Sequence, residues 1–343
     1  MNRSKHKNIA IFIPHLGCGH KCVFCDQKQI SGTAWPPSDD EAEAVIKGAY
    51  EMLSDGDGAE IAFFGGSFTG IKRKYMLSLL TAANKYILSD GRIKGIRIST
   101  RPDLIDTEIL DLLTEYKVTA IELGAQSMDD GVLDVVRRGH DADAVVKAAK
   151  LIKLRAVEFG LQMMTGLPEA SFESDIKTAL DFVKLRPDTV RIYPAIVVKG
   201  TELEDMYNSG AYLPLSVDEA VERCVALVKI FEEEDVKIIR MGLHADESLE
   251  NGYVAGPYHP AFRELVEGAM MKEAAIGAFE KMPCDFELEE KNVTISVAPG
   301  YKSKMIGQKR CNAKFFIERY KIISFTVKED DELDGRAVFI SIL

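Results

Sequence analysis

The chain has 343 residues, of which 46% are hydrophobic and 28% are charged, and its net charge is −11. This composition is ordinary for a globular protein and excludes disordered, collagen-like and coiled-coil chains. The acidic balance argues against non-specific coating of DNA, and no apolar run approaches the roughly 20 residues that span a bilayer. The short apolar run Ile9–Ile13 is not a signal peptide, because Pro14 and His15 interrupt it. We therefore expect a cytoplasmic protein that does not contact membranes.

Short apolar runs alternate with longer amphipathic segments up to about residue 245. The predicted strands are, in chain order, Asn8–Pro14, Glu60–Phe64, Gly95–Thr100, Thr119–Gly124, Val157–Met164, Thr189–Tyr193 and Val236–Met241. The predicted helices between them are Glu41–Leu53, Lys72–Leu88, Thr107–Tyr116, Asp141–Leu154, Phe172–Leu185 and Val217–Glu234. Such alternation predicts βαβ units, a parallel sheet and an α/β fold. Periodicity leaves open a whole or partial (β/α) barrel of the TIM type or an open doubly wound sheet.

The pattern changes near Ala245, where we place a domain boundary between residues 1–245 and 246–343. Ala261–Phe279 is predicted to be one helix. Four strand-like segments without intervening helices follow: Asn292–Ala298, Phe315–Arg319, Ile322–Lys328 and Arg336–Ile342. We therefore expect residues 246–343 to form a small C-terminal α+β subdomain.

Three of the six cysteines form a tight cluster with the spacing C-x3-C-x2-C, directly after the first predicted strand. They are Cys18, Cys22 and Cys25. In a protein without an export signal, such a cluster indicates a metal or catalytic site more than a disulfide framework. Three thiolates can hold three irons of a [4Fe–4S] cube and leave the fourth iron open to a substrate or cofactor. A structural zinc site is the alternative, with His15 or His20 as the fourth ligand.

This motif, with the aromatic Phe24 just before its last cysteine, resembles that of the radical S-adenosylmethionine (SAM) superfamily. The resemblance implies a [4Fe–4S] cluster and SAM as cofactors, with an external electron donor of the flavodoxin or ferredoxin type. In that family the cluster donates one electron to SAM, and the resulting 5′-deoxyadenosyl radical abstracts a hydrogen atom from the substrate. The protein itself supplies binding, orientation and shielding.

The motifs that follow the later strands extend the resemblance over roughly residues 8–243. By the family's pattern, the residues that position SAM are Gly65, Gly66, Ser67, Gln126, Arg138, Gln162 and Ala195. Taken without the family, the glycine pair is equally consistent with a tight turn, and Arg138 with a solvated charge in the next helix. The segment Ser99–Asp103 contains "TRPD", a signature of the Elongator catalytic subunit and its relatives, although Arg101 and Asp103 are also consistent with a local ion pair.

Within the superfamily the motifs resemble those of the Elongator-like branch, which implies a tRNA nucleoside as substrate. We expect no acetyltransferase domain, because residues 245–343 are too short for one and contain no glycine-rich acetyl-CoA loop. A second enzyme reading is tetrapyrrole chemistry similar to that of the oxygen-independent coproporphyrinogen III oxidases. A third reading is a non-catalytic RNA-binding or zinc-stabilised module. No stable protein partner is implied.

The C-terminal subdomain contains a basic segment in which aromatic residues are interleaved. The candidate RNA-binding residues are Lys302, Lys304, Lys309, Arg310 and Lys314. Basic and aromatic side chains together suit phosphate contact and base stacking. The alternative is a β-sheet with the aromatic residues on its inner face. Cys311 is interpreted as an inert thiol, and His244, which follows the seventh strand, is the candidate general acid or base.

Overall fold

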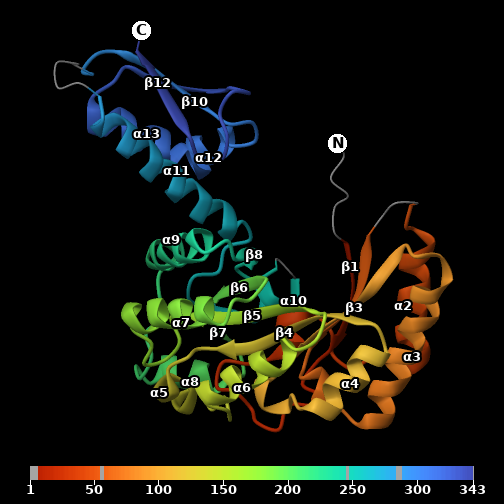
Figure 1. Cartoon of the computed structure of the whole chain (residues 1–343). Coiled ribbons are helices and arrows are strands. Elements are labelled where there is room, and N and C mark those ends of the chain that lie inside the picture. Colours follow the sequence, from red (N-terminus) through yellow and green to blue (C-terminus); the bar gives the residue numbers. More distant parts are fainter. Residues whose placement is uncertain (1–6, 55–57, 245–246, 283–287, 343) are drawn as a thin grey trace. The chain divides into compact units, whose positions relative to one another are not determined.

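A computed structural model describes residues 7–54, 58–244, 247–282 and 288–342. The chain divides into two compact units. The first contains Met1–Val217 and Leu227–Tyr258, and the second contains Asp218–Ala226 and His259–Leu343. Figure 1 shows the elements of each unit.

The first unit is built on a seven-stranded parallel sheet with the strand order β1-β2-β3-β4-β5-β6-β8. The sheet is curled into a half-barrel (Figure 1), so the α/β fold is confirmed, and of the architectures that the periodicity leaves open the chain adopts the partial TIM-type barrel. The strands are β1 (Lys7–Ile13), β2 (Ala59–Gly65), β3 (Ile93–Thr100), β4 (Val118–Gln126), β5 (Glu158–Thr165), β6 (Thr189–Pro194) and β8 (Lys237–Met241). In a parallel sheet the carboxyl ends of all strands meet at one edge, so the loops that follow the strands come together there.

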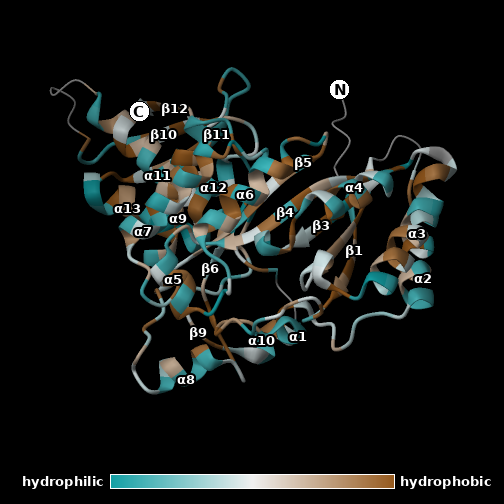
Figure 2. Ribbon diagram, turned by 60° about the horizontal axis from the view of Figure 1, so that its bottom comes forward, coloured by the Kyte–Doolittle hydropathy of each residue, from teal (hydrophilic) through white to brown (hydrophobic). Residues whose placement is uncertain are grey.

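Helices connect successive strands, as the alternating pattern predicts. They are α2 (Asp39–Glu51), α3 (Arg73–Asp90), α4 (Thr107–Glu115), α6 (Ala142–Ile152), α7 (Phe172–Lys184) and α9 (Val217–Glu233). Their starts follow from local chemistry: Ser38 and Glu41 form a capping box at α2, and Asp106, Asp141 and Ser171 cap α4, α6 and α7. Figure 2 shows the strands largely in hydrophobic colours and the helices in mixed colours, which is the pattern of helices with one buried face.

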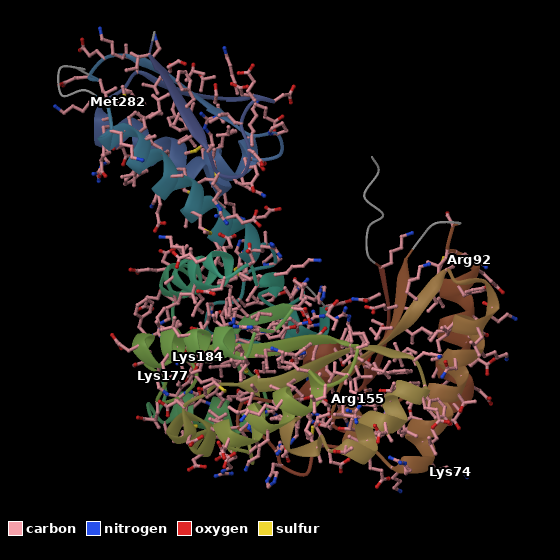
Figure 3. All side chains as sticks on the ribbon, viewed as in Figure 1. Lys74, Arg92, Arg155, Lys177, Lys184 and Met282 are labelled. Atoms are coloured by element: carbon pink, nitrogen blue, oxygen red, sulfur yellow. The ribbon has the colours of Figure 1, made fainter. Side chains whose placement is uncertain are left out.

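The solvent face of α7 illustrates this arrangement (Figure 3). Lys177 and Lys184 are exposed, and both form ion pairs with Asp181, at 3.4 Å and 2.7 Å. Exposed pairs of this kind contribute little to stability, about 0.2–0.5 kcal/mol each.

Shorter elements lie in the loops of the first unit. They are α1 (Gln27–Ser31), η1 (Phe68–Gly70), η2 (Pro102–Leu104), α5 (Asp130–Val135), β7 (Val197–Val198), α8 (Glu202–Asn208), α10 (Glu247–Gly252) and β9 (Tyr253–Ala255). Strands β7 and β9 pair in antiparallel orientation. Among the described residues, no helix has the length and apolar character required to cross a membrane.

The second unit packs helices against a three-stranded sheet of order β11-β10-β12. Its elements are α11 (Phe262–Glu280), β10 (Asn292–Val297), α12 (Lys302–Ile306), η3 (Gln308–Arg310), α13 (Cys311–Tyr320), β11 (Ser324–Glu329) and β12 (Val338–Ile342). Strand β10 pairs with β11 in parallel and with β12 in antiparallel orientation. The predicted helix and three of the four predicted strands of this region are confirmed.

The predicted strand Phe315–Arg319 is wrong, because these residues lie in helix α13. Aromatic and β-branched residues favour strands, and this preference misled the prediction. The buried residues of α13 are Asn312, Ala313 and Phe316, a spacing that places them on one face of a helix. Phe316 stacks on Phe325 of β11, with ring centroids 5.1 Å apart, and is fully buried.

We expect Phe316→Ala to destabilise the second unit by about 3–5 kcal/mol, because it removes a fully buried ring from the core. Phe339→Ala is the matched control, because Phe339 is 60% exposed, and it should stay within about 0.5 kcal/mol of the parent. Hydrogen exchange at the amides of β10 and β11 measures both effects. Equal exchange in the two variants would contradict the assignment of Phe316 to this core.

Candidate functional site

A cavity of about 140 Å³ lies in the first unit, and loops from the carboxyl ends of β1 to β5 contribute to its wall. It brings together ten of the residues predicted from the sequence. They are Cys18, Cys22, Phe24, Cys25, Gly65, Gly66, Ser67, Gln126, Arg138 and Gln162. These residues come from positions spread over more than 140 residues of the chain. The parallel topology places them at one edge of the sheet.

The cysteine loop, residues 14–26, is closed at its base by the side chain of Gln27. The backbone N–H of His15 donates to Gln27 Oε1, and the backbone N–H of Gln27 donates to His15 Nε2 at 3.0 Å. Gln27 Nε2 also donates to the carbonyl oxygen of Gly65 at the end of β2. His15 Nε2 is therefore occupied as an acceptor, which disfavours His15 as the fourth ligand of a zinc ion. The sequence analysis did not identify Gln27.

Glycines let the cysteine loop lie directly on the loop that follows β2. A Cβ atom on Gly66 would lie 2.0 Å from the carbonyl oxygen of Leu16, and one on Gly17 would lie 2.1 Å from that of Ser67. Gly17 also has a positive φ of 74°. The backbone N–H of Ser67 donates to the Leu16 carbonyl oxygen at 2.9 Å. The close approach of two backbones thus requires glycine here, whichever ligand the cavity binds.

The thiols of Cys18 and Cys22 affect the ionisation of the Cys25 thiol. Burial, together with the neighbouring thiols of Cys22 and Cys18, raises the pKa of Cys25 to about 12. A bound cation would favour the Cys25 thiolate, because it compensates the negative charge. A cubane binds each thiolate to a different iron, so three cysteines in one loop fit an iron–sulfur cluster.

Arg138 lies in a turn after α5 and not in the helix predicted from the sequence. Positive φ angles at Arg137 (52°) and Gly139 (72°) form the turn. The guanidinium of Arg138 donates to the carbonyl oxygen of Gly124, and its Nη1 lies 3.4 Å from Cys22 Sγ. This buried cation therefore lies against one of the cluster cysteines.

The "TRPD" segment supports this turn from the side of β3. Arg101 is 1% exposed and forms a two-pronged ion pair with Asp103, at 2.9 Å and 3.0 Å. Its Nη2 also donates to the carbonyl oxygen of Gly139 at 3.0 Å. A Cβ on Gly139 would lie 2.4 Å from the ring of His20, so His20 of the cysteine loop packs on the same backbone. Arg101 therefore stabilises the turn on which the cysteine loop rests.

His140, at the end of this turn, is half-buried. Burial and the charge of Arg138 lower its pKa to about 4. Its imidazole is therefore neutral near pH 7 and carries no proton to donate as a cation.

Gln126 reaches the cavity from an irregular point of the sheet. The register between β4 and β5 shifts between Gly124 and Gln126, and Gln126 has a φ of 71°. Such a bulge redirects a side chain at a functional edge.

Gln162 of β5 is held by polar side chains from neighbouring strands. Its Nε2 donates to Ser99 Oγ at 3.2 Å and to Glu122 Oε2 at 2.9 Å. Glu122 is 1% exposed and also accepts from Arg191 and Arg97. This network was not predicted from the sequence. The signal was present, because charged residues in the middle of buried parallel strands depart from the usual apolar run.

Two predicted residues are not brought to the cavity. Ala195 is buried, and it packs with Val23 and Phe24 beneath the cysteine loop. His244 is exposed, and it is absent from the cavity wall. Their proposed roles in binding adenine and in acid–base chemistry stay predictions.

Comparison with known families decides how this site is classified. The sequence model of the Radical SAM superfamily matches residues 12–183, about half of the chain. The chain belongs to the radical SAM superfamily. The model of the Radical SAM C-terminal domain matches residues 187–272. The cysteine motif and the cavity both belong to the first of these segments, so the radical SAM core coincides with the candidate site.

Relatives within the superfamily include Elongator proteins. The tRNA uridine(34) acetyltransferase of Methanocaldococcus jannaschii is 31% identical over 137 residues, which cover 39% of this chain and 25% of that protein. Elongator complex protein 3 of Homo sapiens is 32% identical over 258 residues, which cover 63% of this chain and 47% of that protein. The first curated relatives are matched over 25% to 66% of their own length.

Among solved structures, the archaeal Methanocaldococcus infernus Elp3 with an N-terminal deletion is similar, with a TM-score of 0.64. The two chains are 23% identical, and the match covers 79% of this chain and 63% of that one. This similarity establishes a shared fold.

Gly66→Ala should destabilise the first unit by about 1–3 kcal/mol, because the new methyl group overlaps the backbone of the cysteine loop. Gly19→Ala is the control in the same loop, since a Cβ there has no atom within 4 Å. Hydrogen exchange at the amides of β1 and β2, which belong to the first unit, measures the stability of each variant. Alkylation of the loop cysteines should be faster only in Gly66→Ala. Equal stability of the two variants would refute the close packing of the two loops.

Proposed function

We propose that this radical SAM enzyme generates a 5′-deoxyadenosyl radical from SAM at a [4Fe–4S] cluster held by Cys18, Cys22 and Cys25. The observation that carries the proposal is that these three thiols line one cavity together with Gln126, Arg138 and Gln162. When bound, the cluster supplies the electron that splits the sulfonium C–S bond.

In this proposal the residues of the chain bind SAM, orient it and shield it from water. Phe24 is buried beside the cysteines and excludes water from one side of the cavity. The loop of Gly65, Gly66 and Ser67 lines the cavity, and its backbone carbonyl oxygens suit the amino end of SAM, because its Gly66 and Ser67 N–H groups already donate to Ile13 and Leu16. Arg138 suits the carboxylate of SAM, because a guanidinium matches a carboxylate in charge and shape.

The substrate in this proposal is a tRNA nucleoside. Similarity to proteins named tRNA uridine(34) acetyltransferase and Elongator complex protein 3 supports it. The segment from α12 to α13 in the second unit is a basic surface suited to phosphates. Its exposed members are Lys302, Lys309, Arg310 and Lys314, and in the described part of the chain none of them has an ion-pair partner. Lys304 is committed to an ion pair with Glu267.

Burial limits which aromatic residues of this surface can stack on a base. Phe316 is fully buried in the core, whereas Phe315 and Tyr320 pack against the same core and are partly buried. Phe316 is therefore not part of a stacking platform, and base stacking by the other two rings stays a prediction. The proposal retains phosphate contact as the source of RNA affinity.

The reaction needs a one-electron donor of low potential, for which a flavodoxin or ferredoxin is the expected class. We propose that the enzyme works in the cytoplasm, where it would meet a tRNA substrate and such a donor.

The cluster proposal is tested with full-length protein that is purified and reconstituted without oxygen. It should contain about four irons per chain, as a [4Fe–4S] cube does, and should cleave SAM when reduced by dithionite. Cys22→Ser should lose the iron, whereas Cys311→Ser, at an exposed cysteine outside the cavity, should keep it. Colourless protein with one zinc per chain would overturn the proposal.

The tRNA proposal is tested by reversing charges on the basic surface. Lys309→Glu with Arg310→Glu should weaken tRNA binding and lower the slope of log affinity against log salt by about two, one for each lost phosphate contact. Lys291→Glu with Lys328→Glu, two exposed lysines of the same unit, is the control of equal charge. Equal losses in the two variants would indicate general attraction and no specific surface.

A further inference from the structure

The turn that follows α5, residues 136–139, is fixed to the cysteine loop at both of its ends. The backbone N–H of Val23 donates to the carbonyl oxygen of Val136 at 3.2 Å. At the other end of the turn, Gly139 lies against the ring of His20, because a Cβ there would be 2.4 Å from the imidazole. The turn therefore rests on the segment between the first and the third cysteine, and a shift of the turn moves its side chains relative to the thiols.

Arg138, inside this turn, directs its guanidinium at one of the thiols. Its Nη1 donates to Cys22 Sγ at 3.4 Å. Its Nε donates to the carbonyl oxygen of Gly124 at 3.2 Å, and its Nη2 donates to the same oxygen. Arg138 and Cys22 are both buried, so water screens the N–H···S contact only weakly. The contact depends on where the turn places the backbone of Arg138.

Arg101 of the "TRPD" segment holds the turn from the side of β3. Its Nε and Nη2 form the two-pronged ion pair with Asp103, at 2.9 Å and 3.0 Å. Nη2 also donates to the carbonyl oxygen of Gly139, the residue after Arg138, at 3.0 Å. A planar guanidinium that is held by a carboxylate donates in one fixed direction. Arg101 thus determines the position of the carbonyl group that follows Arg138.

A hydrogen bond from a cation to a ligating cysteine affects electron uptake. Reduction adds one negative charge to an iron–sulfur cluster, and a hydrogen bond to a sulfur ligand stabilises the more negative, reduced form. The loss of such a bond therefore lowers the reduction potential. Arg137 offers a comparison, because it is exposed and pairs with Glu202 at 2.7 Å. Of these two neighbouring arginines, Arg138 is the one that donates to a thiol.

We propose that Arg101 is a positioning residue for the cluster: through the carbonyl oxygen of Gly139 it holds Arg138 Nη1 against Cys22 Sγ, and this contact raises the reduction potential of the cluster. The inference rests on the proposed function, because it requires a cluster at the three cysteines. It gives the "TRPD" segment and the turn after α5 one joint role. It also accounts for a buried arginine whose ion pair by itself is weak evidence for stability.

The test measures the midpoint potential of the reconstituted cluster in the full-length protein without SAM, by a redox titration that is followed by electron paramagnetic resonance. Arg101→Lys keeps the positive charge but has no planar fork to join Asp103 to Gly139. At the midpoint potential of the parent, the ratio of reduced to oxidised cluster should fall at least threefold, the effect of one weakened hydrogen bond. For a one-electron couple this is a shift of about 28 mV to lower potential.

Arg137→Gln is the matched control, because it removes a positive charge from the same turn and leaves the contact between Arg138 and Cys22 in place. Its ratio of reduced to oxidised cluster should stay within twofold of that of the parent. The opposite pattern, a shift in Arg137→Gln and none in Arg101→Lys, would mean that charge and not position sets the potential, and it overturns the inference.

A double variant tests whether Arg101 acts through Arg138. Arg138→Met removes the N–H donor and should lower the potential by itself. In that background, Arg101→Lys should cause no further shift, because the contact that it positions is already absent. Shifts that add in the double variant would show that Arg101 acts by another route, and they overturn the inference.

Iron content and unfolding midpoint are measured for each variant. If Arg101→Lys does not fold, Asp103→Asn replaces it, since the Asp103 side chain is 31% exposed. Removal of a negative charge alone would raise the potential, so a lower potential in Asp103→Asn identifies the loss of position. If the parent binds no cluster, both the proposed function and this inference are overturned. If it binds a cluster whose potential does not fall in the folded Arg101→Lys or Asp103→Asn variant, only this inference is overturned.

Discussion

The contact between two backbones, those of the cysteine loop and of the loop after β2, is the constraint on which the site depends. Gly66 and Gly17 have no room for a side chain, because carbonyl oxygens of the opposite loop lie about 2 Å from where a Cβ would stand. Gln27 then joins the base of the cysteine loop to Gly65. The strands that precede these loops are buried and parallel. The contact therefore fixes the cysteine loop, with its three thiols, to a rigid sheet.

Buried charged side chains hold parts of the cavity wall in position. Arg138 lies against Cys22, and Arg101 holds the turn that carries it. Glu122 and Arg191 pair across the middle of the sheet and leave Gln162 with its amide in one direction. A buried ion pair is weak evidence for stability, since desolvation offsets most of the Coulomb attraction. Here the pair fixes the position of the Glu122 carboxylate, because Arg191 holds both of its oxygens.

The second unit shows how surface charge and core packing separate within one segment. Along α13, Phe316 stacks on Phe325 of β11, while Phe315 and Tyr320 pack against the core and are partly buried. Lys314 is exposed, while Phe316, two residues later, is fully buried. A helix produces this separation with its own period, so interleaved basic and aromatic residues do not by themselves indicate base stacking. The charge of Lys314 remains available for phosphates, and the ring of Phe316 is not available for stacking.

The resemblance to the radical SAM superfamily supplied most of the cavity wall, and the tertiary structure chose the half-barrel over an open doubly wound sheet. The sequence by itself determined the parallel α/β fold, because seven apolar runs alternate with amphipathic helices, and it identified the cysteine motif. These signals are local: a period, a cap or a spacing can be read from adjacent residues. Tertiary structure alone decided the helix at Cys311–Tyr320, the turn that carries Arg138, and the roles of Gln27 and Glu122. Those features depend on residues that are distant in the sequence. Glu122, for example, contacts Arg97, Gln162 and Arg191 on three other strands. Which side chains of neighbouring strands meet follows from the register of the sheet, and that register is settled only when the whole sheet forms.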